Sequence, residues 1–340
     1  MGENATNSSQ LPWHQEDWNR IQAARRSGRL PHALLVSGAR GIGKGRFAQD
    51  LAASMLCNSP DDGGQPCGRC QGCHLFRAGT HPDYTRIVPE EPGRAIRIDR
   101  IREYIARGAL TAQAGGYKVV VIEPADALNI AAANSLLKTL EEPVNWTLIL
   151  LVSALPERLP ATIRSRCQRL QLPLPARTKA EQWLTAETGG KNAGLLLDLA
   201  SGAPLQALEL AGSDILAIRE RLLEEFSGVL KGEKDPVAVA THWNGFDLQR
   251  LLTWVSGWLI DMLRLKAIPD FSGLINPDQT NRLRTLGNRL EFAQLYCLLD
   301  RVYEAIQALG SQLNSLMLLE GFLLALAANN QGPRTKRELR

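Results

Sequence analysis

The sequence of 340 residues lacks a hydrophobic run long enough to cross a membrane. Its two most apolar windows, residues 251–265 and 316–328, are both interrupted by charged side chains. They fall short of the roughly 18 uncharged residues that a membrane span needs. The first ten residues also lack the basic start and apolar core of a secretory signal. We therefore expect a cytoplasmic protein with no membrane partner.

The sequence also has little excess of either charge. Its 39 Lys and Arg residues nearly balance its 35 Asp and Glu residues, which leaves a net charge of +4. This weakly basic balance permits contact with nucleic acid but does not require it. The composition, 44% hydrophobic and 22% charged, is that of a globular protein, and a chain of this length is expected to form two or three domains.

Cysteine is scarce outside one short stretch, so a disulfide framework is not expected in a cytoplasmic chain of this size. Cys167 and Cys297 stand alone, whereas Cys57, Cys67, Cys70 and Cys73 lie within 17 positions. Four thiolates at this spacing, in a glycine-rich segment, can form a closed tetrahedral shell around a structural Zn²⁺ ion. The alternative is four thiols without a metal, two of them a redox pair.

Two histidines, His74 and His81, follow the cysteines closely. A shell of four thiolates leaves no position for a further ligand. We expect both to be ordinary surface or loop residues.

The first half of the chain alternates between strand-like and helix-like segments, which favours an α/β domain with a parallel sheet. Most of the strand-like segments are continuous apolar runs, as expected for strands buried on both faces. The expected strands are 33–36, 84–88, 119–122, 148–152 and 169–172, and the expected helices between them are 47–56, 99–107 and 130–142.

After residue 172 the strand-like runs end and every later apolar stretch has helical spacing. Leu248, Leu252, Val255 and Leu259, for example, form one face of a long helix. We expect an α/β domain over 1–172 that includes a cysteine module at 57–73. A small helical domain follows over 173–211, then an α-helical domain over 212–330 and a basic tail over 331–340.

A glycine-rich stretch, GARGIGKG at residues 38–45, lies between the first expected strand and a helix. This is the context in which such a loop binds phosphate, with backbone N–H groups around the phosphates and a lysine that neutralises their charge. Gly38, Gly41, Gly43 and Lys44 match that pattern. Gly45 stands where a serine or threonine hydroxyl should hold Mg²⁺.

A second departure follows the strand at 119–122. Active enzymes place an Asp-Glu pair there to hold Mg²⁺ and orient the attacking water. This chain has Glu123-Pro124, so a carboxylate remains at the metal position but proline takes the place of the base. We expect that the chain does not hydrolyse nucleotide by itself. Whether ATP still binds stays open, as does the alternative that the glycines form a plain strand-to-helix turn.

Two further motifs carry a family resemblance: AAANSLLKTLEEP at residues 131–143 and PERLPATIRSRC at residues 156–167. With the phosphate loop, they resemble the clamp-loader branch of the AAA+ ATPases, and a four-cysteine insertion after the loop helix is typical of its bacterial members. The resemblance covers about residues 11–210. It implies an α/β AAA+ module, with a parallel sheet, flanking helices and a zinc-binding insertion, followed by a helical lid domain and an all-α collar domain.

The resemblance also implies roles for particular residues. Arg166 lies in the family's Ser-Arg-Cys motif, whose arginine reaches the ATP site of the neighbouring subunit and stabilises charge on its γ-phosphate. The alternative is that Arg166 makes an ordinary surface or intrachain ion pair. Leu205 stands where active relatives carry a nucleotide-sensing arginine. The implied partners are ATPase-type and delta-type subunits in a hetero-oligomeric ring, which loads a sliding clamp onto primer-template DNA for the replicative polymerase.

Two other functions remain possible from the residues alone. One is an active P-loop ATPase, against which Gly45, Pro124 and Leu205 argue. The other is a free-standing zinc protein that binds nucleic acid. Its basic residues would be Arg94, Arg97, Arg100, Arg102 and Arg107, although such a cluster is also typical of a solvated helix face.

Overall fold

The computed structural model describes residues 11–91, 93–108, 116–144, 146–190, 192–212, 214–309 and 314–329. The chain forms two compact units. The first extends to Trp183 and also includes Ala203–Gln206, and the second comprises Leu184–Gly202 and the chain from Ala207 onward. The basic tail expected at 331–340 lies outside the described residues.

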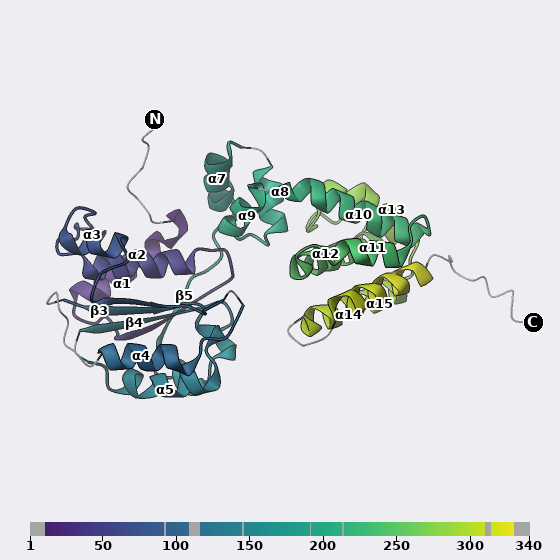
Figure 1. The fold of residues 1–340 in the computed structure, drawn as a ribbon. Helices are drawn as coiled ribbons and strands as arrows, with labels where there is room; N and C mark the ends of the chain where they lie inside the picture. The colour runs from purple at the N-terminus through teal and green to yellow at the C-terminus, as the bar shows by residue number, and fades with distance from the viewer. Residues whose placement is uncertain are drawn as a thin grey trace, which may run out of the picture. The chain divides into compact units, whose positions relative to one another are not determined.

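A five-stranded parallel sheet organises the first unit (Figure 1). Its strands follow the order β2-β3-β4-β1-β5. All five expected strands are present within about a residue of their predicted limits. They are β1 (Ala33–Ser37), β2 (Tyr84–Ile87), β3 (Lys118–Ile122), β4 (Thr147–Ser153) and β5 (Gln168–Gln171).

Helices cover both faces of this sheet, which confirms the predicted α/β domain with a parallel sheet and flanking helices (Figure 1). Helices α1 (Gln15–Arg26) and α2 (Lys44–Leu56) lie on one face, and α4 (Ile98–Gly108) and α5 (Ile130–Glu141) lie on the other. Because successive side chains of a strand point to opposite faces, Leu34 and Val36 pack under α2 while Leu35 packs against α5.

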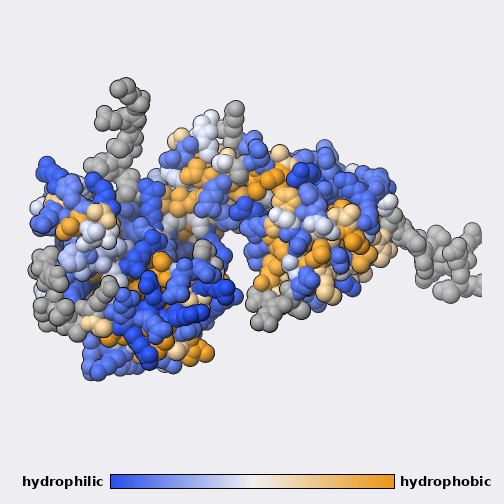
Figure 2. All heavy atoms as spheres, in the orientation of Figure 1, coloured by the Kyte–Doolittle hydropathy of each residue, from blue (hydrophilic) through white to orange (hydrophobic). Residues whose placement is uncertain are grey.

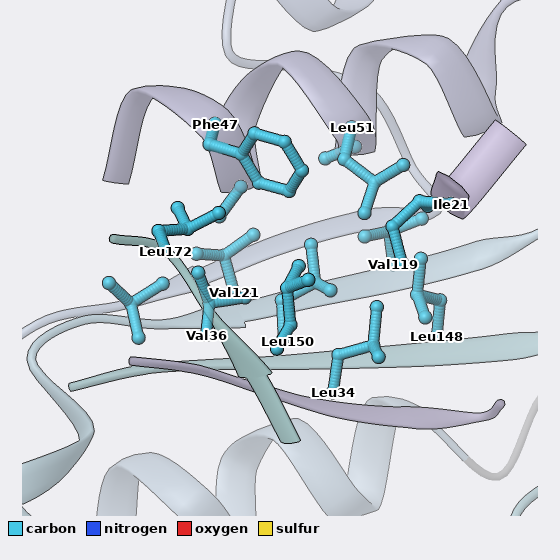
Figure 3. Close-up of a cluster of buried hydrophobic side chains, with 14 of the residues drawn as sticks. Ile21, Leu34, Val36, Phe47, Leu51, Val119, Val121, Leu148, Leu150 and Leu172 are labelled. Carbon is cyan, nitrogen blue, oxygen red and sulfur yellow. The ribbon is translucent and has the colours of Figure 1, made fainter. Parts of the chain in front are cut away.

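Figure 3 shows the core under α1 and α2, where Phe47 and Leu51 meet Val121 and Leu150 from the sheet. These side chains are at most 1% exposed. Each contributes roughly 1.5–3 kcal/mol to folding through the apolar surface it buries. This core fixes α2, and with it the glycine-rich loop that leads into the helix.

Short elements connect the main ones in the first unit. They are η1 (Pro12–His14), α3 (Gln71–Arg77), η2 (Ala125–Ala127), η3 (Pro156–Arg158) and α6 (Ala161–Arg164). The Asn129 side chain caps α5 by accepting a hydrogen bond from the Ala132 N–H at 2.8 Å.

Helices make up the rest of the described chain, as predicted. Helices α7 (Arg177–Thr188), α8 (Ala193–Leu199) and α9 (Pro204–Ala211) occupy the segment expected to be a small helical domain. The exact domain limits stay predictions. The later helices are α10 (Ile215–Lys231), α11 (Pro236–Trp243), α12 (Leu248–Ala267), η4 (Pro277–Gln279), α13 (Thr280–Gly287), α14 (Phe292–Ala308) and α15 (Ser315–Ala328).

The helical part of the second unit packs around α12. Of its predicted stripe, Leu252, Val255 and Leu259 are buried, and Leu248 at the helix start is half-buried. A buried polar network ties the segment before α13 to this core. The Asp261 carboxylate, fully buried, accepts hydrogen bonds from the backbone N–H groups of Ile275 and Asn276. Arg219 donates to Asp278 at 2.7 Å. No helix in the described part of the chain is long and apolar enough to cross a membrane.

Candidate functional site

The glycine-rich loop lies at the carboxyl end of β1, beside its neighbour β4. In open parallel sheets, ligands bind at this end of the strands. Gly43 caps α2 with a φ of +90°, and Gly41 has a φ of +74°. Glycine adopts such left-handed backbone without the steric cost of a Cβ. The strand, turn and helix expected for a phosphate loop are all present.

The loop is packed against two other segments of its own chain. A Cβ on Gly43 would lie 2.2 Å from Leu11 Cδ1 and 3.3 Å from both His14 Cε1 and Leu205 Cδ1. The Leu205 N–H donates a hydrogen bond to the Gly41 carbonyl at 2.9 Å. The start of the described chain and the start of α9 therefore both contact the loop.

The segment before α1 is tied firmly to the loop. The Trp13 indole N–H donates to the Ile42 carbonyl at 2.9 Å, and the His14 ring packs edge-on against Phe47. His14 is 1% exposed, and burial is the main cause that lowers its pKa to about 4. The imidazole is therefore neutral at physiological pH and acts as a packing group.

Lys44, the residue expected to neutralise phosphate charge, turns back onto the loop. Its Nζ donates to the Ala39 carbonyl at 2.5 Å, and the residue is 8% exposed. Burial lowers the pKa of Lys44, while Asp126 and Glu123 act in the opposite direction. A nucleotide phosphate would have to replace this internal contact.

Gly45 and Glu123 form a matched pair at the position of the expected metal ligand. A Cβ on Gly45 would lie 1.9 Å from Glu123 Oε1. Glu123 also forms an ion pair with Arg86 at 3.0 Å. The Glu123 carboxylate thus lies where the side chain of a serine or threonine would begin, so the glycine at position 45 and the carboxylate at position 123 fit each other.

The four cysteines predicted to bind metal come together in space, with all four sulfur atoms within 4.8 Å of one another. The distance between the sulfurs is 3.8 Å for Cys57 and Cys70 and 4.0 Å for Cys67 and Cys73. Ligands about 2.3 Å from a tetrahedral Zn²⁺ ion have such separations. The geometry fits zinc, and neither nearby histidine belongs to this group of possible ligands among the described residues.

Backbone N–H groups prepare one thiol of the cluster for metal binding. Cys70 Sγ accepts from the N–H groups of Asn58 and Cys73, both at 3.4 Å. Burial acts to raise the pKa of Cys70, but these and other hydrogen bonds outweigh it and lower the pKa to about 6. Burial raises the pKa of Cys73 to about 12, so a metal must displace the proton of that thiol.

The loop between the first two cysteines is anchored to the sheet-covering helices. The Trp18 indole N–H on α1 donates to the Gly63 carbonyl at 2.9 Å. On α2, the Ser54 hydroxyl donates to the Gly64 carbonyl and accepts from Gln22 at 3.3 Å. The cysteine module therefore stabilises the same helices that frame the phosphate loop.

Arg166, the arginine expected to act on a neighbouring subunit, follows the short helix α6 and is about one-third exposed. Its Nε donates to Glu141 Oε1 at 2.8 Å, and its Nη1 donates to the Thr162 carbonyl at 3.0 Å. The guanidinium therefore lies at the surface of the first unit and is held in place from two sides.

The basic cluster suggested as a DNA contact is exposed along its described part. Arg94 pairs with Glu91 at 3.2 Å, and Arg100 pairs with Glu103 at 3.7 Å. Arg97 and Arg102 are also exposed, whereas the side chain of Arg107 lies outside the described residues. This arrangement fits a solvated helix face, and a contact with DNA stays a prediction.

Sequence reasoning missed three partners of the expected site residues: Leu11 at Gly43, Glu123 at Gly45 and Glu141 at Arg166. Leu11 lies beside a Pro-Trp dipeptide at a helix start. The dipeptide indicates where the chain enters α1, but it does not indicate which residues Leu11 contacts. Glu141 lies in the recognised LEEP motif, yet its partner is 25 residues away.

Comparison with known proteins decides the family. A family model described as DNA polymerase III, delta subunit, matches residues 13–176, and a model of its C-terminal part matches residues 213–328. The DNA polymerase III subunit delta' of Pseudomonas aeruginosa is 36% identical over 93% of this chain and 97% of its own length. This chain belongs to the DNA polymerase III delta' subunit family.

Other delta' subunits support the same assignment. That of Escherichia coli is 34% identical over 93% of this chain and 94% of its own length. Among solved structures, a DNA polymerase III gamma subunit-related protein from Thermotoga maritima covers 92% of this chain with 15% identity and a TM-score of 0.49. The family models and the delta' relatives, not this structural likeness, confirm the family resemblance expected from the sequence.

Proposed function

We propose that this delta' family member is a clamp-loader subunit that does not hydrolyse nucleotide itself. It assembles with ATPase-type and delta-type subunits into a ring that loads a sliding clamp onto primer-template DNA. Within that ring, Arg166 reaches the ATP site of the adjacent subunit and stabilises negative charge on the γ-phosphate.

The packing of the phosphate loop is the observation that carries the first part of this proposal. Leu11 and Leu205 contact Gly43, Lys44 binds the loop's own carbonyl, and Glu123 lies against Gly45. These contacts hold the loop by intramolecular interactions and leave no hydroxyl for Mg²⁺ at position 45. Nucleotide binding in this loop, which the sequence left open, would require several of them to break.

The last helix of the described residues supports the assembly part of the proposal. Helix α15 is apolar on its outer side, where Met317 is 69% exposed and Leu324 is 51% exposed. Gly321 and Ala328 continue the same exposed stripe. Figure 2 shows hydrophobic residues at the surface of the helical unit in the region of these last helices. Exposed apolar faces of this kind mark protein–protein contacts.

The cysteine cluster supports a structural zinc ion. Four thiolates complete the tetrahedral shell, so no position remains for a water or substrate. The ion would supply no reaction step. It would fix the loop that carries Gly63 and Gly64 against α1 and α2.

The test is steady-state ATP hydrolysis by the chain alone and by the clamp loader reconstituted with and without it. We expect the chain alone to match its Lys44→Ala variant, and the complete complex to require the chain for full turnover. Arg166→Ala should assemble normally yet lower turnover of the complex. An arginine of this kind can contribute about 10³-fold at its own site, and the loss over several sites is smaller.

Two results would overturn the proposal. Hydrolysis by the isolated chain well above that of Lys44→Ala would identify an active ATPase. Tight DNA binding by the isolated chain that is lost on zinc chelation would identify a free-standing nucleic-acid-binding protein.

A further inference from the structure

The surroundings of Arg166 carry an inference that rests on the proposed trans role of this arginine and extends it. Arg166 follows α6, and Glu141 is the last residue of α5. The Glu141 Oε1 atom accepts from Nε at 2.8 Å and forms an ion pair with Nη2 at 2.5 Å. One carboxylate oxygen thus binds both nitrogens, Nε and Nη2, on one edge of the guanidinium.

The opposite side of the guanidinium is held by the backbone. Nη1 donates to the Thr162 carbonyl at 3.0 Å and to the Ser165 hydroxyl at 3.4 Å. That carbonyl belongs to the last turn of α6, where carbonyl groups have no partner within the helix. The carbonyl also accepts from the Ser165 hydroxyl at 3.1 Å, and a cation placed there is stabilised by its partial negative charge.

The guanidinium of Arg166 has more N–H donors than these contacts use fully. A guanidinium has five N–H donors in a fixed planar fork. Nε and one N–H of Nη2 face Glu141, and one N–H of Nη1 faces Thr162. The second N–H of Nη1 faces the Ser165 hydroxyl in a long hydrogen bond of 3.4 Å. The second N–H of Nη2 has no partner among the residues that the structure describes. A phosphate that replaces the long Ser165 contact would therefore find one donor on each terminal nitrogen of the fork.

We propose that Glu141 is a positioning residue for Arg166. It orients the guanidinium so that its two terminal nitrogens can meet a neighbour's γ-phosphate, with only the long Ser165 contact to replace. An arginine side chain otherwise samples many rotamers, and holding it before the neighbour arrives lowers the cost of ordering it in the complex.

The alternative is that Glu141 competes with phosphate for Arg166 and acts as a restraint. The two roles predict opposite changes in turnover. Glu141→Ala removes the carboxylate, whereas Glu141→Gln keeps an oxygen that can accept from Nε but removes the charge. Glu142→Ala is a matched control, because Glu142 is an exposed acidic residue in the same turn.

The experiment measures kcat and KM for ATP in the reconstituted clamp loader with clamp and primed DNA, alongside assembly by size-exclusion chromatography. Since an exposed ion pair contributes up to about 1 kcal/mol, Glu141→Ala should lower kcat roughly three- to five-fold. We expect assembly and KM to be unchanged, Glu141→Gln to be intermediate and Glu142→Ala to match the wild type. In an Arg166→Ala background, Glu141→Ala should have no further effect.

Each contrary result has a definite meaning. A higher kcat for Glu141→Ala would show that Glu141 restrains Arg166. An equal loss with and without Arg166 would show that Glu141 acts on the fold instead. Either result refutes the positioning role while the proposed function stands. If Arg166→Ala itself leaves turnover unchanged, the trans role fails and the positioning role fails with it.

Discussion

Replacing Gly43 with alanine tests whether the phosphate loop is closed by the residues around it. The new Cβ would lie 2.2 Å from Leu11 Cδ1, far inside ordinary contact, and Leu11 is 2% exposed and has little room to move. Overpacking of this kind costs about 1–3 kcal/mol. The φ of +90° at Gly43 adds about 1–2 kcal/mol for a residue with a Cβ.

Gly79→Ala is a control that isolates the clash from the backbone strain. Gly79 has a φ of +70°, and a Cβ there would meet nothing within 4 Å. It should therefore cost only the strain of about 1–2 kcal/mol. The difference between the two variants reports the contact with Leu11.

The assay is deuterium exchange of β1 and β4 peptides, because amides in core strands exchange through global opening of the surrounding structure. With about 2 kcal/mol of additional destabilisation, these peptides should exchange roughly 30-fold faster in Gly43→Ala than in Gly79→Ala. Equal exchange in the two variants would mean that Leu11 does not close the loop, and the argument for an inactive nucleotide site would lose its main support.

Two further predictions concern protonation and metal. The pKa of His14 is about 4 in the folded chain and about 6.5 in an unfolded one. At pH values between these two, the unfolded state therefore binds one more proton than the folded state. The free energy of unfolding should therefore fall by roughly 3 kcal/mol as the pH drops from 6.5 to 4. Urea titrations of His14→Gln at several pH values should lack this part of the pH dependence. Removing the proposed zinc ion with a chelator, or by Cys70→Ser, should loosen the loop that binds the Trp18 indole. We expect faster deuterium exchange in α1, and unchanged exchange would contradict the anchoring role.

The sequence predicted features that depend on neighbours along the chain. The strands were predictable because each is a short apolar run bounded by turn residues, and burial on both faces of a parallel sheet selects such runs. The cysteine cluster was predictable because its ligands lie within 17 positions. The glycine pattern of the loop was predictable because Gly41 and Gly43 adopt left-handed backbone, which favours glycine whatever the distant packing.

Features that depend on distant packing were not predictable. Helix α2 begins at Lys44, three residues before the expected start, since Gly43 can cap it in a left-handed conformation. Leu11 reaches Gly43 only after α1 has packed on the sheet. Glu123 reaches Gly45 because the ends of neighbouring parallel strands meet at one edge. The spacing of residues along the chain does not indicate contacts of this kind between distant positions.

The contact between Gly45 and Glu123 has a consequence for how this subunit could change over evolutionary time. A serine at position 45 would meet the carboxylate of Glu123, and moving that carboxylate would release Arg86 on β2. Three elements would therefore have to adjust before a catalytic Mg²⁺ ion could be held. No single substitution restores the Mg²⁺ ligand without disturbing the other contacts. We therefore expect a subunit with this arrangement to keep it once it has arisen.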